Sequence, residues 1–438
     1  MMKNALVKSI FFGEKLRVLH EKQRRYEALS AQPEICDYQL ERFNEIWGEA
    51  CRNIPFYREW RLRHSLPARI NSLSELDSFP VLTKRDIQEA KELIFKDLPN
   101  SPVISTGGSS GEPAVFPTSR GEGDQVYGNV YLGRGWWGIE PLDDILLFWG
   151  HSHLFGTGWK GKLNQLKRTL GDWLINTSRY NAYDMSVRTL GRYYEVLKRS
   201  NPNLIMGYTS TIYKLAKYIR EHKLDIGEKV ELKGVIVTSE SVTDYDVELI
   251  ESVFGVPCII EYGMAETGVI AYSKGQSDQL NIFWDSFIAR TDETNVLLVS
   301  TLYPRVFPLI NYRTDDVVEI FEEYQGSIRS VSKIAGRKKD ILCVKSTKGE
   351  LIELSGILMV HLLKGYPNIY EIVFRQLDDD VVKIKYTSDV DVDTRQVAEY
   401  FLGNIRIDHP DINEQSFIFE RVEHIAKTIA GKAKVVEK

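Results

Sequence analysis

The sequence predicts an α/β protein with at least two domains, a large N-terminal one and a small C-terminal α+β one. Three observations lead to this prediction. The chain has 438 residues, of which 43% are hydrophobic and 27% charged, and exceeds what one hydrophobic core usually organises. Between residues 103 and 336, short apolar runs alternate with helical stretches, which is the pattern of α/β layers. A charged turn then precedes a compact final stretch of about a hundred residues.

The region before residue 100 is expected to be helical. Apolar residues recur at helical spacing from Ile10 onward and again over residues 38–52. A third helix should begin within the stretch LTKRDIQEAKELIF. Thr83 is a suitable N-cap there, because its hydroxyl can accept a hydrogen bond from a backbone amide of the first turn.

The expected strands begin at Val103. Each apolar run is short and is followed by small or polar residues, as in VISTGG, ILLFWG, NLIMG, GVIVTS and PCIIEYG. Helical stretches such as residues 211–222 separate these runs. We therefore expect a layered α/β arrangement for this part of the chain.

The boundary between the two expected domains lies in the turn Gly-Arg-Lys-Lys-Asp at residues 336–340, which gives domains 1–336 and 337–438. Beyond this turn the pattern predicts a strand over 381–386, a helix over 394–402 and a strand over 417–421. The second domain is therefore expected to be a small α+β unit.

Composition excludes several classes of protein. The formal net charge is −5 and basic stretches such as residues 22–25 are short, so nucleic acid is not an expected partner. No apolar run approaches the roughly 20 residues of a membrane helix, and the first residues lack a cleavage pattern, so we expect a cytoplasmic protein. The oligomeric state is left open. Four scattered cysteines without metal spacing predict reduced thiols: Cys36, Cys51, Cys258 and Cys343.

A glycine and hydroxyl loop follows the first apolar run. Glycines allow close backbone approach, and free amides and hydroxyls can bind phosphate oxygens. No Lys-Ser or Lys-Thr pair follows the last glycine, so this is not a Walker loop. A phosphate-binding loop and a flexible surface turn both fit these residues: Thr106, Gly107, Gly108, Ser109, Ser110 and Gly111.

Four further segments carry chemistry, although each alone also fits a solvated loop or a frayed chain end. Residues 261–267, EYGMAET, combine an aromatic that can stack on a purine with a carboxylate that can hold magnesium. Residues 311–316, NYRTDD, offer a carboxylate suited to a ribose diol. The other two are the charged turn 336–340 and the stretch 427–432, KTIAGK.

The order and separation of these five segments resemble those of the adenylate-forming superfamily, which includes the acyl-CoA synthetases. Within it, the chain is most similar to the phenylacetate-CoA ligase branch with its CapK-like relatives. The stretches NIPFY at 53–57, FPVLTK at 79–84 and GYTS at 207–210 extend the resemblance along the chain. It implies the adenylate-forming enzyme fold, with a mobile C-terminal domain.

The resemblance also implies a role for each matching position around the nucleotide. The loop from Thr106 to Gly111 would hold the β and γ phosphates, and Glu266 would hold magnesium. The base and ribose would be bound by Ser239, Glu240, Tyr262, Gly263, Asp316 and Arg337. Among these, Tyr262 would stack on adenine and Asp316 would bind both ribose hydroxyls.

The remaining implied roles concern catalysis and movement. Lys432 would bridge the substrate carboxylate and the α-phosphate, and is with Glu266 the expected catalytic residue. Lys339 lies at the family's hinge, about which the small domain swings. His151 and His153 lie where the branch has residues near the acyl pocket, although surface or structural histidines also fit.

Three departures from the family pattern bear on activity. Ala265 stands where the family usually has a threonine that touches the nucleotide phosphate, and Asp315 replaces a more frequent glycine. Where the family lines its pantetheine tunnel with a glycine loop, this chain has the longer, more polar stretch 343–349, CVKSTKG. Lys348 and Glu350 would crowd such a tunnel, unless they lie on a solvated hairpin tip.

The expected reaction is ATP-dependent adenylation of a carboxylic acid, followed by acyl transfer. ATP, Mg²⁺ and, as the acceptor, coenzyme A are the implied cofactors. The alternative is a CapK-like transferase that passes the acyl group to an amine or hydroxyl, such as a sugar, in surface polysaccharide biosynthesis. A nucleotide-binding protein without catalysis is a third reading, disfavoured because Glu266, Asp316, Arg337 and Lys432 are all present.

Overall fold

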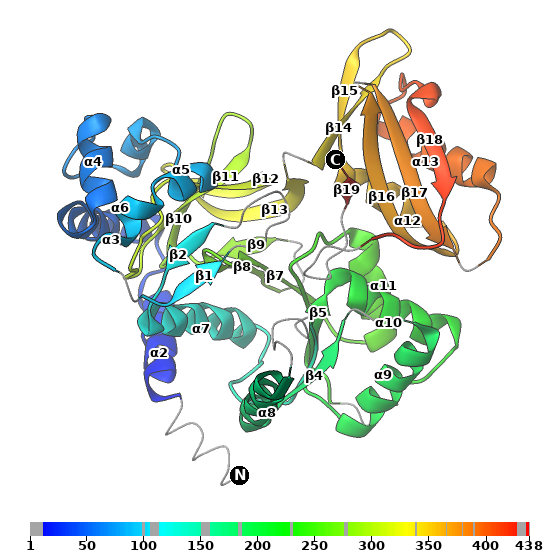
Figure 1. The fold of residues 1–438 in the computed structure, drawn as a ribbon, viewed down its shortest axis with the longest axis horizontal. Coiled ribbons are helices and arrows are strands. Elements are labelled where there is room, and N and C mark those ends of the chain that lie inside the picture. The colour runs from blue at the N-terminus through cyan, green and yellow to red at the C-terminus, as the bar shows by residue number, and fades with distance from the viewer. Residues whose placement is uncertain are drawn as a thin grey trace. The chain divides into compact units, whose positions relative to one another are not determined.

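A computed structural model describes most of the chain (Figure 1). The described residues are 12–98, 101–105, 114–149, 158–182, 186–227, 231–275, 279–337, 340–364, 366–378, 380–388, 390–426 and 435–437. They fall into two units by their contacts. Unit 1 comprises Met1–Asp143, Leu174–Asn176 and Ile259–Ile334, and unit 2 comprises Asp144–Trp173, Thr177–Cys258 and Ala335–Lys438. The domain boundary at 336/337 stays a prediction.

Unit 1 begins with helices, as predicted. They are α2 (Gly13–Ala28), α3 (Gln32–Asn53), α4 (Pro55–Arg63), the short 3-10 helix η1 (Leu73–Ser78), α5 (Lys84–Glu89) and α6 (Lys91–Phe95); a further helix, α7 (Arg120–Gly135), comes later in the chain. Thr83 is the N-cap of α5, as expected: its hydroxyl accepts from the Asp86 amide, and its own amide donates to the Asp86 carboxylate. This reciprocal pair satisfies two backbone donors of the first turn.

Antiparallel strands make up the rest of unit 1. The strands are β1 (Val103–Ser105), β2 (Val115–Pro117), β7 (Cys258–Met264), β8 (Gly268–Ser273), β9 (Leu280–Ile282), β10 (Phe287–Thr291), β11 (Val296–Thr301), β12 (Tyr312–Tyr324) and β13 (Ser327–Arg337). β1 pairs with β2, and the others follow the order β10-β11-β12-β13-β9-β8-β7. The segment 311–316, interpreted from the sequence as a loop, therefore runs into a strand.

The middle of the chain gives unit 2 a parallel sheet. Its strands β3 (Ile145–Trp149), β4 (Thr177–Asn181), β5 (Leu204–Tyr208) and β6 (Gly234–Thr238) have the order β6-β5-β3-β4. The helices are α8 (Gly158–Leu174), α9 (Val187–Ser200), α10 (Thr209–Glu221) and α11 (Asp244–Phe254). The apolar runs ILLFWG, NLIMG and GVIVTS are confirmed as strands, and helices connect them as in other parallel sheets.

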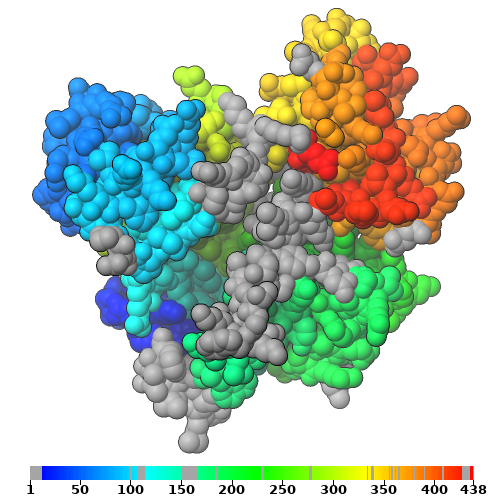
Figure 2. Space-filling model, viewed as in Figure 1, coloured from blue at the N-terminus to red at the C-terminus, as the bar shows by residue number. Residues whose placement is uncertain are grey.

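The C-terminal elements of unit 2 form a second, smaller α+β layer, coloured yellow to red in Figure 2. They are β14 (Ile341–Lys345), β15 (Leu351–Ser355), α12 (Gly356–Lys364), β16 (Ile369–Asp378), β17 (Val381–Ser388), α13 (Thr394–Asp408), η4 (Glu414–Ser416), β18 (Phe417–Arg421) and β19 (Val436–Glu437). Four strands have the order β18-β17-β16-β19 and share one core with both helices. All three predicted elements of this region are confirmed.

Within unit 2, this layer contacts α10. Lys214 Nζ lies 2.5 Å from Glu371 Oε1, and Lys217 Nζ donates to the Ile369 carbonyl at 3.2 Å. Lys217 is buried, with its ammonium 3.7 Å from the centre of the Tyr370 ring. The start of β16 is thus held to α10 by charge and by a cation–π contact.

Two other expectations concern the whole chain. All four cysteines are free thiols, as predicted, and burial raises the pKa of Cys258. Over the part of the chain that the structure describes, every helix is too short or too polar to span a bilayer.

Candidate active site

The end of β7 carries two predicted site residues, Tyr262 and Gly263. β7 pairs with β8 with a register shift between these two residues, and such irregularities redirect side chains. A Cβ at Gly263 would lie 2.5 Å from the Gly268 carbonyl oxygen and 2.8 Å from the Val269 Cα. Only glycine permits this approach, which gives Gly263 a structural reason in addition to the predicted contact with nucleotide.

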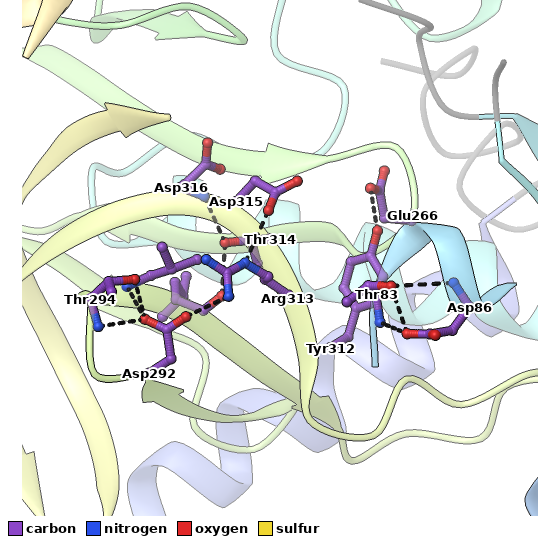
Figure 3. A network of polar contacts seen from close by, with 12 residues as sticks. Thr83, Asp86, Glu266, Asp292, Thr294, Tyr312, Arg313, Thr314, Asp315 and Asp316 are labelled. Atoms are coloured by element: carbon purple, nitrogen blue, oxygen red, sulfur yellow. Dashed lines mark hydrogen bonds and ion pairs between the residues drawn. The ribbon is translucent and has the colours of Figure 1, made fainter. Parts of the chain in front are cut away.

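A hydrogen bond joins two of the segments singled out in the sequence. The Tyr262 hydroxyl donates to Asp316 Oδ2 at 2.8 Å, across 54 positions in the chain. Asp316 lies on β12 with 8% of its surface exposed, and its amide donates to the Thr314 hydroxyl at 3.2 Å (Figure 3). The aromatic proposed for adenine and the carboxylate proposed for ribose are therefore neighbours in unit 1.

Glu266 follows β7 in a turn and is held by Tyr312. The Tyr312 hydroxyl donates to Glu266 Oε1 at 3.0 Å, and Figure 3 shows the two side chains pointing toward each other. Burial and then the Glu266 carboxylate raise the pKa of Tyr312 far above its ordinary value, so the phenol remains a donor. Glu266 itself is half-buried. Its carboxylate is thus fixed in orientation yet still reached by solvent.

A buried ion pair supports the turn that carries Glu266. Arg305 Nε lies 3.3 Å from Glu122 Oε2, with side-chain exposures of 2% and 4%. Arg305 also contacts the Tyr303 hydroxyl at 3.4 Å, and that hydroxyl donates to the Thr267 carbonyl at 3.0 Å. Glu122 in addition accepts from the Val306 amide at 2.9 Å. These contacts connect α7 with the residue that follows Glu266.

The sequence interpretation missed Glu122, Tyr303 and Arg305. Tyr303 and Arg305 lie a few positions before the segment 311–316, which was the available signal in the sequence. Nothing in the sequence pointed to Glu122, because its partner, Arg305, lies 183 positions further along the chain.

Two other stretches of the resemblance support β12. Leu82, in FPVLTK, forms a parallel bridge with Tyr312: its amide donates to the Asn311 carbonyl at 3.1 Å and its carbonyl accepts from the Arg313 amide at 2.9 Å. Tyr57, in NIPFY, stacks on Phe307 with ring centres 5.1 Å apart and donates to the Pro308 carbonyl. Both stretches hold the segment that leads into the candidate site.

Comparisons with known proteins extend over most of the chain, although no family model matches it. Protein CapK of Staphylococcus aureus is 23% identical over 419 residues, covering 91% of this chain and 88% of CapK. Phenylacetate-coenzyme A ligase of Escherichia coli K12 is 24% identical over 330 residues, covering 71% and 73%. A crystal structure of 2-hydroxyisobutyryl-CoA ligase, in the postadenylation state with R3-HIB-AMP, matches with a TM-score of 0.66 at 18% identity, covering 93% and 90%.

The chain has the adenylate-forming enzyme fold. Its sequence is similar to the phenylacetate-CoA ligase and CapK branch, as the motifs predicted. The same ligase in an open conformation, with 2-HIB-AMP and CoA, matches with a TM-score of 0.56 at 19% identity.

The first departure from the family pattern is Ala265. Ala265 is exposed, whereas Thr267 is 1% exposed. The Thr267 hydroxyl donates to the Gly268 carbonyl at 2.9 Å, and the Thr267 carbonyl accepts from Tyr303. Thr267 is therefore engaged inside unit 1 and does not replace the hydroxyl that the family has at position 265.

The second departure, Asp315, has a backbone explanation. Asp315 has φ +65°, in the left-handed region that glycine adopts most readily, which accounts for the more frequent glycine at this position. Its carboxylate lies 3.1 Å from Arg313 Nε, and Arg313 Nη1 also lies 2.6 Å from Asp292 Oδ2 (Figure 3). Aspartate is among the residues that tolerate this conformation, so the departure is a mild one.

The third departure is the tip between β14 and β15. Lys348 pairs with Asp411 at 2.6 Å, and the two side chains are 67% and 51% exposed. The Ser346 hydroxyl accepts from the amides of Lys348 and Glu350 at 3.2 and 3.0 Å. This is the solvated hairpin tip weighed in the sequence analysis, so its charges are weak support for an acceptor other than coenzyme A.

Unit 2 holds three more predicted residues, Ser239, Glu240 and Arg337. Ser239 has φ +67°, and Glu240 Oε2 accepts from the Ser210 amide at 2.8 Å. Ser210 is in the first turn of α10, where a carboxylate is favoured by the helix dipole. The stretches GYTS and Ser239-Glu240 are thus brought together. Arg337 is the last residue of β13.

Five predicted features lie outside the described residues. They are the loop Thr106, Gly107, Gly108, Ser109, Ser110 and Gly111, the two histidines His151 and His153, the hinge residue Lys339, and Lys432. Their roles stay predictions.

Glu266 is the described residue that could bind a magnesium ion at the nucleotide. Among the described residues, no group of three or more His, Cys, Asp or Glu side chains is arranged to hold a metal ion. Magnesium bound to nucleotide usually takes only one or two protein carboxylates and completes its shell with phosphate oxygens and water. A single oriented, half-exposed carboxylate such as Glu266 fits that mode.

Proposed function

We propose that the chain activates a carboxylic acid with ATP, forming an acyl-adenylate and pyrophosphate, and then transfers the acyl group to coenzyme A. The observation that carries this proposal is the 2.8 Å hydrogen bond between Tyr262 and Asp316. It unites an aromatic ring and a buried carboxylate from two segments that the resemblance assigns to adenine and ribose. The similarity to phenylacetate-coenzyme A ligases supports the reaction type.

Asp316 and Tyr262 would bind the nucleoside. A carboxylate offers two acceptor oxygens, which suits the two adjacent hydroxyls of a ribose. The Tyr262 hydroxyl donates to one oxygen of the Asp316 carboxylate, Oδ2, and thereby fixes the orientation of that carboxylate before nucleotide binds. The half-buried Tyr262 ring has a face available for stacking on the base.

Glu266 would hold magnesium at the triphosphate, with Tyr312 keeping its carboxylate in one orientation. When bound, the metal ion would neutralise charge on the departing pyrophosphate. The amides and hydroxyls of residues 106–111 would contact the β and γ phosphates.

Lys432 would bring the two anionic reactants together. In the first step a carboxylate oxygen of the acid bonds to the α-phosphorus, and the bond to the β-phosphate breaks as pyrophosphate leaves with the electron pair. In the second step the acceptor's nucleophilic atom bonds to the acyl carbon and gives up its proton to water, and the bond from the acyl carbon to the phosphate oxygen breaks as AMP leaves with the electron pair. An ammonium between carboxylate and α-phosphate offsets their repulsion, a contribution typically worth about a hundredfold to a thousandfold in rate.

A second acceptor class has its own support. The similarity to CapK extends over 91% of this chain, more than the similarity to the phenylacetate-CoA ligases. The alternative function is therefore a transferase that forms the same adenylate but passes the acyl group to an amine or hydroxyl in surface polysaccharide biosynthesis. Both functions use ATP, which fits a place in the cytoplasm.

The experiment that tests the proposal is pyrophosphate release from ATP and Mg²⁺ across aryl, aliphatic, amino and sugar acids, each with and without coenzyme A. One AMP per thioester with an accepted acid would support the ligase. Adenylate that accumulates untouched by coenzyme A would favour the transferase. Absence of acid-dependent pyrophosphate release across the panel would contradict both.

A further inference from the structure

Helix α8 turns an apolar face to solvent. Leu163, Leu166, Leu170 and Trp173 are 41%, 65%, 56% and 59% exposed. Their spacing of three, four and three residues places them on one side of the 17-residue helix. Large apolar side chains scattered singly on a surface are ordinary, but a continuous row of them marks an interaction site.

One polar residue of α8, Asp172, faces the protein. Asp172 forms a bidentate ion pair with Arg179 of β4, at 2.9 and 3.1 Å, and its side chain is only 13% exposed. A residue two positions from Leu170 lies on the opposite side of a helix. Amphipathic helices of globular proteins usually bury their apolar stripe, whereas α8 exposes its apolar row.

Charge favours one kind of partner for this face. The α8 sequence contains Lys160, Lys162, Lys167 and Arg168, and its one acidic residue, Asp172, is already paired with Arg179. Lys167 is exposed and lies one turn from Leu163, beside the apolar row. The whole chain has a net charge of −5, so the basic character of α8 differs in sign from the chain's net charge.

We propose that α8 docks the protein on the surface of a bilayer that contains anionic phospholipids. An apolar row on a basic helix, with Lys167 beside it and a tryptophan near one end, is the arrangement of helices that lie in the plane of a membrane interface. The leucines would enter the acyl boundary, Lys167 would meet anionic headgroups, and Trp173 would lie at the headgroup level. This docking is peripheral and does not depend on the proposed reaction.

The test is co-sedimentation of the full chain with vesicles. One set consists of equimolar phosphatidylglycerol and phosphatidylcholine, and the other of phosphatidylcholine alone. We expect binding to the anionic vesicles, weakened by salt, and at least about a tenfold loss of partitioning in the double variant Leu166→Gln/Leu170→Gln. Lys167→Glu should also weaken binding. Leu62→Gln is the matched control, because Leu62 on α4 is 76% exposed but lies outside α8.

Unfolding curves serve as the folding control, since changes at exposed positions should leave the thermal midpoint nearly unchanged. Loss of binding in the α8 variants but not in Leu62→Gln supports the proposal. Absence of wild-type binding, equal binding to both vesicle types, or undiminished binding of the double variant would overturn it. A wild-type dimer that the double variant dissociates, with no vesicle binding, would overturn it in favour of a second copy of the chain.

Discussion

At position 265 the chain presents a methyl group where the adenylate-forming family usually presents a hydroxyl to the nucleotide phosphate. Ala265 is exposed and Thr267 is engaged elsewhere, so adding the hydroxyl should be sterically possible and chemically useful. We expect Ala265→Thr to increase acid-dependent pyrophosphate release several-fold, as one charge-assisted hydrogen bond allows. Ala265→Val, with the same shape but no hydroxyl, is the control. An equal effect of threonine and valine would show that the hydroxyl is not involved.

Asp316 and Glu266 should differ in how their variants fail, because they would act on different parts of ATP. Asp316→Ala should mainly raise the KM for ATP, by about tenfold or more if hydrogen bonds to the ribose hydroxyls are lost. Glu266→Gln should instead raise the Mg²⁺ concentration needed for half-maximal rate. Titrations of both variants with ATP and with Mg²⁺ separate the two effects. An unchanged metal dependence in Glu266→Gln would remove Glu266 from the metal site.

Local chemistry decided which residues could be predicted. Thr83 was predicted as an N-cap from its residue type at the start of a helical pattern, and its partner in the structure, Asp86, is only three positions away. The fixing of Glu266 by Tyr312 and the contact between Tyr303 and Thr267 join residues 36 or more positions apart, and depend on how strands pack. A single sequence does not show which residues so far apart in the chain lie close together in the fold. For the same reason the acyl pocket could not be predicted residue by residue.

At the scale of elements, the ion pair between Arg305 and Glu122 anchors the loop after β11 to α7. Removing one partner of a buried pair leaves an uncompensated charge, which typically costs about 3–5 kcal/mol. Arg305→Met should therefore lower the free energy of unfolding by about 3 kcal/mol, measured by urea denaturation. The double variant Glu122→Gln/Arg305→Met should recover part of the loss. Strictly additive losses would mean that the pair does not couple the two elements.

The strands that could be predicted from the sequence are the buried ones. β3, β5 and β6 are parallel strands that read as continuous apolar runs, and their positions were predicted. The segment 311–316, which runs into β12, was interpreted as a loop because of its paired acids, although the first residues of β12 alternate between buried and more exposed. The run PCIIEYG, residues 257–263, was predicted as a strand, and β7 continues one residue further, to Met264.

At the scale of the whole molecule, the account requires the C-terminal layer to change its position between the two half-reactions. Lys339 is the proposed hinge, and Lys432 would serve only the first half-reaction because the layer then carries it away. Within unit 2 the layer contacts α10 through the Lys214–Glu371 pair and through Lys217. Both contacts would have to break for the layer to move away from α10.

The central claim is that the chain makes an acyl-adenylate with the help of Lys432. The most direct measurement is acid-dependent exchange of pyrophosphate into ATP, compared with turnover of a supplied acyl-adenylate, for wild type and Lys432→Ala. The account predicts that Lys432→Ala loses exchange by roughly a hundredfold or more while the supplied adenylate is still consumed at close to the wild-type rate. An equal loss in both half-reactions, or exchange that Lys432→Ala leaves intact, would contradict it.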